Sequence, residues 1–305
     1  MSLDEKQRDW LTLTLVPGVG TTLFIRLLAR FGTPGEVLCA SEAALAEVVG
    51  AKRAQRIRGY RDAVDVAGQE RALERYNARL ITLDDAEYPA RLAEIHDPPL
   101  VLFVRGELRE ADADCVAVVG TRKPSTYGLR MAEGLGEDLA RRGLTVVSGM
   151  AAGVDAAAQQ GALQAGGRTI AVLGCGVDIV YPSHHAELMH RIIEQGCVLS
   201  PFAMGVKPAR GHFPSRNPII SGLSLGTLVV EAPPGSGALI TARHAAEQGR
   251  EVFAVPGRAG EHNSRGPHAL IREGAKLVES IDDIVVELEL PAEARVAPTQ
   301  ESAET

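Results

Sequence analysis

The sequence lacks the features of disulfide-built, zinc-binding and membrane-spanning proteins. Its four cysteines, Cys39, Cys115, Cys175 and Cys197, stand singly without a CxxC pair, and this spacing favours reduced thiols over disulfides or zinc ligands. No apolar run approaches the length that crosses a bilayer, and the first ten residues lack the basic start and apolar stretch of a secretory signal. We therefore expect a cytoplasmic protein with no membrane insertion.

The motifs of several enzyme classes are also missing. No lysine follows a glycine in the GxxxxGK[ST] arrangement that grips nucleoside triphosphates, and LGCGVDIV (173–180) lacks the third glycine of a dinucleotide fingerprint. No HExxH zinc motif occurs, and we expect His184, His185 and His190 to be solvent-facing helix residues. The sequence thus predicts binding rather than turnover, with no cofactor and no metal.

Charge is distributed unevenly along the chain, although the total is −7. Residues 1–80 carry 12 basic and 10 acidic side chains, residues 81–280 carry 19 and 22, and residues 281–305 carry 1 and 7. The acidic excess therefore lies mostly at the C-terminus, where abundant Pro, Ala and Glu predict a disordered tail over 289–305.

Two windows inside the main body contain basic side chains and no acid. Residues 115–132 hold Arg122, Lys123 and Arg130, and residues 195–230 hold Lys207, Arg210 and Arg216. Such windows favour an anionic partner despite the acidic average, because the location of charge matters more than its sum.

The first 80 residues have a helical pattern. Apolar residues recur three and four positions apart on both sides of Pro-Gly-Val-Gly (17–20), and a weaker copy surrounds Gly50. We expect an all-helical domain over 1–80 with helix–hairpin–helix units. Two interpretations of the hairpins are open: part of a small bundle, or a site where hairpin amides meet DNA phosphates.

From Cys115 onward, apolar runs alternate with helical segments, which predicts βαβ units and a parallel sheet. We expect an α/β domain over 81–288 with an extended Rossmann-like, doubly wound, mostly parallel sheet. The proline-containing segment 83–108 is expected to be a connector plus an extra edge strand. The six runs are CVAVVG, LTVVSG, TIAVLG, CVLSPF, TLVVEA and EVFAVPG.

Four loops are expected at the carboxyl edge of this sheet, where open parallel sheets bind ligands. In chain order they are GTRKPSTYG (120–128), SGMAAGVD (148–155), KPARGHFPSRNPIISGLS (207–224) and EAPPGSGALITA (231–242). Glycines let the backbone approach an oxyanion, and Arg and Lys add positive charge. In the second loop, Asp155 is expected to be structural; Phe213 could equally be core, and Ser236 a simple helix cap. The candidate DNA contacts are Gly120, Arg122, Lys123, Ser125, Tyr127, Gly149, Gly153, Lys207, Arg210, His212, Phe213, Arg216, Asn217, Ser236 and Gly237.

Five segments give the chain a family resemblance: GTRKPSTYG (120–128), SGMAAGVD (148–155), FPSRNPIISGLS (213–224), SGALITARHAAEQGREVFAVPG (236–257) and LIREGA (270–275). In this order they resemble the DprA family, also called Smf, of bacterial DNA-processing proteins. The resemblance implies a dimeric single-stranded DNA binder that protects incoming strands and loads the RecA recombinase in natural transformation. It also implies a SAM-like helical domain before an extended Rossmann fold, and no established enzymatic activity.

The resemblance assigns DNA contacts to three arginines. Arg122 matches the arginine of the family's G-S/T-R turn, Arg210 lies where a basic residue precedes His-Phe-Pro, and Arg216 belongs to the Arg-Asn pair. A site that grips a few nucleotides binds modestly, whereas two sites on a symmetric dimer can share one strand. We therefore expect a homodimer.

Four positions depart from the family pattern. Gln159 stands where His is usual, Pro201 where Glu is usual, Pro218 where a second Arg is usual, and His268 where Asn is common. We expect these changes to alter the pocket, and Pro218 to weaken phosphate attraction. We also expect the winged-helix-like domain with which many members end to be absent.

Two alternatives to DNA binding stay open. A Rossmann-type nucleoside monophosphate phosphoribohydrolase could use basic glycine loops to hold a phosphate. However, PPGSGALITA (233–242) lacks the glutamate of the PGGxGTxxE pattern found in such enzymes. A structural dimer scaffold with incidental basic loops leaves the two acid-free windows unexplained.

Overall fold

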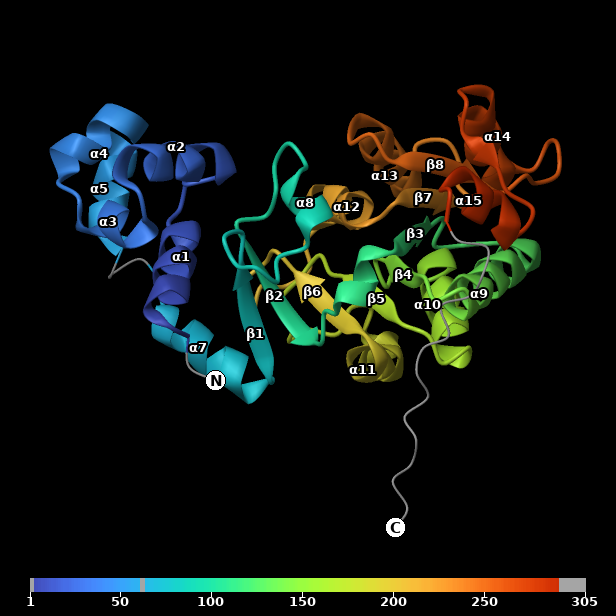
Figure 1. The fold of residues 1–305 in the computed structure, drawn as a ribbon, viewed down its shortest axis with the longest axis horizontal. Coiled ribbons are helices and arrows are strands. Elements are labelled where there is room, and N and C mark those ends of the chain that lie inside the picture. Colours follow the sequence, from blue (N-terminus) through green and yellow to red (C-terminus); the bar gives the residue numbers. More distant parts are fainter. Residues whose placement is uncertain (1–2, 61–63, 291–305) are drawn as a thin grey trace, which may run out of the picture.

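A computed structural model of the protein describes residues 3–60 and 64–290. Figure 1 shows a helical domain at one end of the molecule and a sheet with helices on both faces at the other. Within the described ranges, no helix is long and apolar enough to cross a membrane.

The helical domain forms around two hairpins, as predicted. Gly18 has a φ of 90° in the turn between the first two helices, a conformation that glycine adopts without strain. Asp4 and Thr33 cap helices through capping boxes with Gln7 and Glu36. The helices are α1 (Glu5–Leu15), α2 (Thr21–Phe31), α3 (Pro34–Cys39), α4 (Glu42–Val49), α5 (Ala51–Arg58) and α7 (Val66–Arg75).

The nine strands form one sheet of order β1-β2-β6-β5-β4-β3-β7-β8-β9. The seven strands from β6 to β9 are parallel, and β1 and β2 extend the sheet in antiparallel fashion. The strands are β1 (Ala78–Thr82), β2 (Val101–Gly106), β3 (Cys115–Val119), β4 (Thr145–Ser148), β5 (Thr169–Val172), β6 (Cys197–Ser200), β7 (Gly226–Val229), β8 (Glu251–Ala254) and β9 (Lys276–Leu277). The expected Rossmann-like sheet is confirmed.

The first two strands correct two expectations. Residues 78–80, which we placed in the helical domain, begin the edge strand β1. The apolar run inside 83–108 forms β2, which is not an edge strand because it pairs with β1 on one side and β6 on the other. The apolar side chains of β1 are buried on both faces of the sheet, so this strand is part of the core.

Helices cover both faces of the sheet (Figure 1). In β3, Ala117 and Val119 pack into the core under α12 and α13, whereas Val116 and Val118 pack into the core under α9 and α10. This alternation follows from the two-residue period of a strand. The remaining helices are α8 (Ala90–Ala93), α9 (Thr126–Arg141), α10 (Val154–Gln164), α11 (Ala186–Gln195), α12 (His212–Leu223), α13 (Gly237–Glu247), α14 (Arg265–Arg272) and α15 (Ile281–Glu287), with 3₁₀ turns η1 (Glu110–Ala113), η2 (Ser183–His185) and η3 (His262–Ser264).

Helix α12 is a third correction, because we expected residues 207–224 to form one basic loop. The segment from His212 is helical despite Pro214 and Pro218. Its inward residues Ile219 and Ile220 are buried against the sheet, and this burial offsets the poor helix propensity of proline.

The expected C-terminal tail lies mostly outside the described residues. Within them, the chain stays packed to Leu290, whose amide donates to the Val285 carbonyl at 3.0 Å and whose side chain contacts the core beside α9. Residues 291–305 are not described, so the tail stays a prediction.

Two glycines of α9 predict opposite effects on stability. A methyl group on Gly134 meets nothing within 4 Å, whereas one on Gly136 collides with the Ala158 backbone of α10. We expect Gly134→Ala to raise the free energy of unfolding by up to about 1 kcal/mol through helix propensity. Gly136→Ala should lower it by about 1 to 3 kcal/mol through overpacking. Urea denaturation of both variants measures the difference, and equal effects would contradict close packing of α9 on α10.

Candidate nucleic-acid interface

The sheet has one topological switch point, between β3 and β7. From β3 the chain continues to β4, β5 and β6 on one side, while β7, β8 and β9 extend the sheet on the other. Loops that leave the carboxyl ends of such neighbouring strands diverge and create a crevice. A cleft of about 850 Å³ lies there, lined by the loop after β3, by α12, by the start of α13 and by η3.

Backbone hydrogen bonds hold the loop after β3 in place. The Thr121 amide donates to the Glu231 carbonyl at 2.6 Å, and the Thr121 carbonyl accepts from the Val154 amide at 3.2 Å. The Asn263 side chain donates to the Lys123 carbonyl at 3.1 Å. The backbone is thus fixed to the loop after β7, to α10 and to η3, while the Arg122 and Lys123 side chains are exposed and line the cleft.

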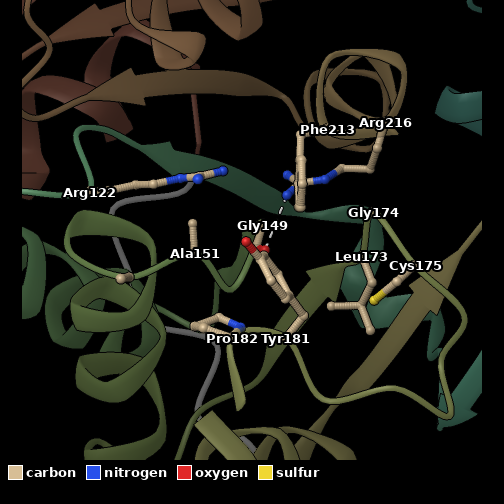
Figure 2. Close-up of a pocket in the computed structure, with 11 residues that line it drawn as sticks. Arg122, Gly149, Ala151, Leu173, Gly174, Cys175, Tyr181, Pro182, Phe213 and Arg216 are labelled. Carbon is tan, nitrogen blue, oxygen red and sulfur yellow. Dashed lines mark hydrogen bonds between the residues drawn. The ribbon is translucent and has the colours of Figure 1, made fainter. Parts of the chain in front are cut away.

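Arg216 on α12 reaches the same cleft from the opposite side (Figure 2). The side chain is only 4% exposed, and its Nη2 donates to the Gly149 carbonyl at 3.2 Å. A side chain at position 149 would occupy the space of the guanidinium, so the second predicted loop needs glycine here. The Nε of Arg216 is buried and has no hydrogen-bond partner among the described residues.

The electrostatics of the cleft are unbalanced toward positive charge. Burial lowers the pKa of Arg216 to about 10; the charge of Asp155 opposes this shift, and that of Arg122 adds to it. Asp155 is the one carboxylate among the described residues that line the cleft. The lining also contains the cationic side chains of Arg122, Lys123 and Arg210. An anion between the arginines would relieve their repulsion and supply the hydrogen-bond acceptor that Arg216 lacks.

Asp155 has the structural role that we expected. It lies in the first turn of α10, and its Oδ2 accepts from the amides of Gly149 at 3.2 Å and Ala151 at 3.4 Å. Burial raises the pKa of this carboxyl, and the charge of Arg216 opposes the shift. The carboxylate therefore orders the loop after β4 that accepts Arg216.

Two aromatic rings line the deep end of the cleft. Phe213 and Tyr181 lie with ring centroids 5.4 Å apart, and the Arg122 guanidinium lies 5.2 Å from the Phe213 centroid. Both rings also line an adjoining cavity of about 160 Å³ together with Arg122, Gly149 and Arg216. Phe213 is half-buried and accessible from the cleft, so it is not simply core.

The structure brings most of the predicted contacts together from four separate segments. Asn217 is buried beside α13 and donates to the Gly237 carbonyl at 3.4 Å. Ser236 caps α13 by accepting from the Ala238 amide at 3.2 Å while it lines the cleft. Those that line the cleft are Gly120, Arg122, Lys123, Arg210, Phe213, Arg216, Asn217, Ser236 and Gly237, and Gly149 lines the adjoining cavity.

Five predicted contacts lie elsewhere. Gly153 adopts a φ of 89° at the start of α10, a backbone conformation that favours glycine. Lys207 is exposed but outside the cleft lining, and the His212 ring faces Phe202, 4.2 Å away between centroids, and the Gly174 carbonyl. Ser125 and Tyr127 line a neighbouring crevice.

Ser125 is occupied by a carboxylate rather than available to a phosphate. Its amide and hydroxyl both donate to Glu231, at 2.8 and 2.6 Å, and the hydroxyl also caps α9 at Gly128. The buried Glu231 therefore fills the position that the sequence suggested for an oxyanion at the start of α9.

None of the four residues that depart from the family pattern is in the cleft lining. Gln159 is fully buried against β5, where its amide donates to the Ile170 carbonyl at 3.2 Å. Pro201 and Pro218 line a different crevice, and the His268 ring contacts the Gly257 backbone. Pro218 lies outside the cleft lining, and its effect on phosphate attraction stays a prediction.

Sequence reasoning missed several cleft residues, three of them with aromatic or polar side chains that are important here, and misplaced one histidine. Tyr181, His262 and Asn263 line the cleft, but none belongs to a basic window, and only the tertiary fold brings them there. His184 and His190 are exposed as expected, whereas His185 is half-buried with its Nδ1 3.1 Å from the Met150 carbonyl, and burial lowers its pKa.

Comparisons with known proteins show the family and fold to which this chain is similar. The family model described as DNA recombination-mediator protein A matches residues 79–289. A Protein Smf of Synechocystis sp. is 40% identical over 291 residues, which cover 93% of this chain and 73% of that protein.

Two solved structures are also similar. DNA processing protein A of Streptococcus pneumoniae superposes with a TM-score of 0.82 at 36% identity, covering 94% of this chain and 99% of that one. A Helicobacter pylori DNA processing protein A structure, described as revealing a single-stranded DNA binding mode, has a TM-score of 0.62 at 30% identity and covers 69% of this chain and 96% of that one.

The burial of Arg216 predicts a gain in stability when its charge is removed. We expect Arg216→Met to raise the free energy of unfolding without ligand by about 1 to 3 kcal/mol, because the desolvated guanidinium lacks a full set of partners. Inorganic phosphate should then raise the melting temperature of the wild type more than that of the variant. Arg130→Met, at an exposed position of α9 outside the cleft lining, is the control. A variant less stable than the wild type would show that Arg216 holds the cleft together.

Proposed function

We propose that this chain, which belongs to the DNA recombination-mediator protein A family, holds single-stranded DNA in the cleft by its phosphate backbone. The observation that carries the proposal is the convergence of Arg122, Arg210 and Arg216 from separate segments on one cleft at the switch point. The DNA-binding mode described for the Helicobacter pylori relative supports it.

The cleft recognises charge rather than sequence. Arginines that neutralise phosphates give sequence-independent binding that weakens as salt rises. Arg216 is buried and pre-positioned, so it loses little side-chain freedom on binding, while the exposed Arg122 and Arg210 draw the strand in.

Tyr181 and Phe213 give the cleft its preference for unpaired strands. Bases of a single strand can leave their stack and lie against aromatic rings, which paired bases cannot do without unpairing. Both rings line the cleft beside the arginines, so a nucleotide whose phosphate meets Arg122 or Arg216 presents its base within their reach.

The family supports a role as recombination mediator in the cytoplasm. We propose that the bound strand is protected and passed to the RecA recombinase during natural transformation, as the family resemblance implies. Sequence-independent grip through phosphates suits such a role, because incoming DNA has no fixed sequence.

The cleft acts by binding rather than by turnover. A phosphoribohydrolase needs a free acid, and Asp155, the single carboxylate among the described lining residues, is held by backbone amides. Ser224 has the GxSxG spacing between Gly222 and Gly226, but it follows a helix rather than a strand, is fully buried and donates to the Ile220 carbonyl at 2.9 Å.

Charge reversal in the cleft tests DNA binding directly. We expect Arg122→Glu and Arg210→Glu each to weaken binding of a labelled oligo-dT at least about tenfold, and to reduce the slope of log affinity against log salt by about 0.7 per lost phosphate contact. Fluorescence anisotropy over a salt series measures both quantities.

The matched control is Arg130→Glu, which changes the charge equally in the same basic window but lies on α9 outside the cleft lining. Equal losses in all three variants would assign the effect to overall charge and not to the cleft.

We also propose that the protein forms a homodimer through the C-terminal part of the sheet domain. Val286 on α15 is 71% exposed, and Leu277 on the last strand, β9, is also exposed. The Lys276–Glu287 ion pair at 3.0 Å joins these two elements, so two apolar side chains are displayed on neighbouring elements. A symmetric pair of chains buries them and places two clefts on one strand.

Oligomeric mass tests this interface. We expect light scattering to give about twice the chain mass of 32.3 kDa, and Val286→Glu to shift the mass toward one copy and to weaken binding of long oligo-dT, because avidity is lost. Ile25→Glu removes an exposed apolar side chain from the helical domain and should leave the mass unchanged. A single-copy mass for the wild type would refute the homodimer.

A further inference from the structure

The helical domain carries a group of cations that the cleft does not use. Residues 16–31 and 50–59, which include α2 and α5, contain no Asp or Glu. All their basic side chains are exposed, and none forms an ion pair with another described residue. On α1, by contrast, Lys6 and Arg8 are paired with acids. We call the group the helical basic surface: Arg26, Arg30, Lys52, Arg53, Arg56 and Arg58.

The two halves of this surface meet at the first hairpin. Arg56 donates to the Pro17 carbonyl at 3.3 Å, and a side chain at Gly18 would lie 3.1 Å from the Arg56 Nη1 and 4.0 Å from the Arg53 Nε. The arginines of α5 therefore lie over the turn that begins α2. Figure 1 shows α2, α4 and α5 grouped at the end of the molecule farthest from α9 and α14.

The surface has cations but no exposed ring on which a base could stack. In α2, Phe24 is fully buried, and Phe31 is half-buried with the Arg30 guanidinium 5.5 Å from its ring centroid; α5 has no aromatic residue. Single-strand sites combine positive charge with stacking rings, whereas duplex DNA is held by phosphate contacts. The composition therefore fits the backbone of a duplex.

An acidic crevice separates the helical basic surface from the cleft. Thr21 at the start of α2 lines this crevice of about 710 Å³ together with residues around α12 and α13. Its carboxylates are Glu94, Asp97 and Glu247. Glu94 is paired with Arg250 and Glu247 with His244, and no Lys or Arg is among the described residues that line the crevice. A phosphate chain therefore meets no Lys or Arg there that could bridge the cleft and the helical basic surface. Two separate contacts on two parts of one DNA molecule follow.

We propose that the helical basic surface binds the sugar–phosphate backbone of duplex DNA, next to the single strand held in the cleft. The inference goes beyond the proposed function and rests on it only in that one DNA molecule engages both surfaces. A duplex with a single-stranded tail is the ligand that fits both.

A double charge reversal tests the surface. We expect Arg26→Glu/Lys52→Glu to weaken binding of a tailed duplex about tenfold and to lower its salt slope, because phosphate contacts are lost. Binding of a short oligo-dT should stay unchanged. Neither side chain makes a hydrogen bond to another described residue, so the melting temperature should match that of the wild type.

The matched control is Arg71→Glu/Arg75→Glu on α7, which changes the net charge equally in the same domain. Unchanged binding of the tailed duplex, or the same loss in the control pair, would overturn the proposal. An equal loss for oligo-dT would also overturn it, because the surface would then serve the single strand.

A blunt duplex keeps the two proposals distinguishable. If the wild type binds the blunt duplex weakly and the Arg26→Glu/Lys52→Glu variant loses this binding, the helical basic surface is supported even where oligo-dT fails to bind the cleft. Failure of oligo-dT alone contradicts the cleft and leaves the duplex contact standing.

Discussion

The structure depends on one unfavourable contact, the burial of the Arg216 guanidinium opposite Arg122. A charged group taken out of water costs free energy unless it is fully paired, and Arg216 has the Gly149 carbonyl but no partner for Nε within the described chain. Burial lowers its pKa to about 10. The surrounding sheet and α12 pack into one core, and in the proposed function an anion in the cleft removes this cost. The proposal therefore sets the stability of the free protein against binding at this residue.

The loops around Arg216 leave its charge only partly compensated. The charge of Asp155 stabilises the guanidinium, but Oδ2 of this carboxylate also accepts from two amides of the loop after β4. Glu231 has both oxygens bound to Ser125 and points toward the neighbouring crevice. Both carboxylates accept hydrogen bonds from backbone amides of the loops, so the cleft keeps its positive charge although the whole chain is acidic. This division of roles leaves a positively charged cleft on a chain with a net charge of −7.

Sequence patterns predicted elements well where the local period was unambiguous. The six apolar runs of the parallel sheet and the hairpins at Gly18 and Gly50 were found because burial on both faces and positive φ angles demand particular residues. Helix α12 was missed because Pro214 and Pro218 lower the local helix propensity. The helix forms nevertheless, because burial of Ile219 and Ile220 stabilises it. Strand β1 was missed because its pairing with β2 is a contact between distant segments.

The sequence alone determined that positive side chains, glycine turns and a parallel sheet occur together, because each follows from residue type and spacing within one segment. Only the tertiary structure decided which of these side chains share a cleft. It placed Arg122, Arg216 and Tyr181 in the lining of one cleft. Ser125, His212 and Pro218 lie outside this lining. The reason is physical: the direction of a side chain depends on how helices pack across the sheet, and that packing energy is shared among segments far apart in the chain.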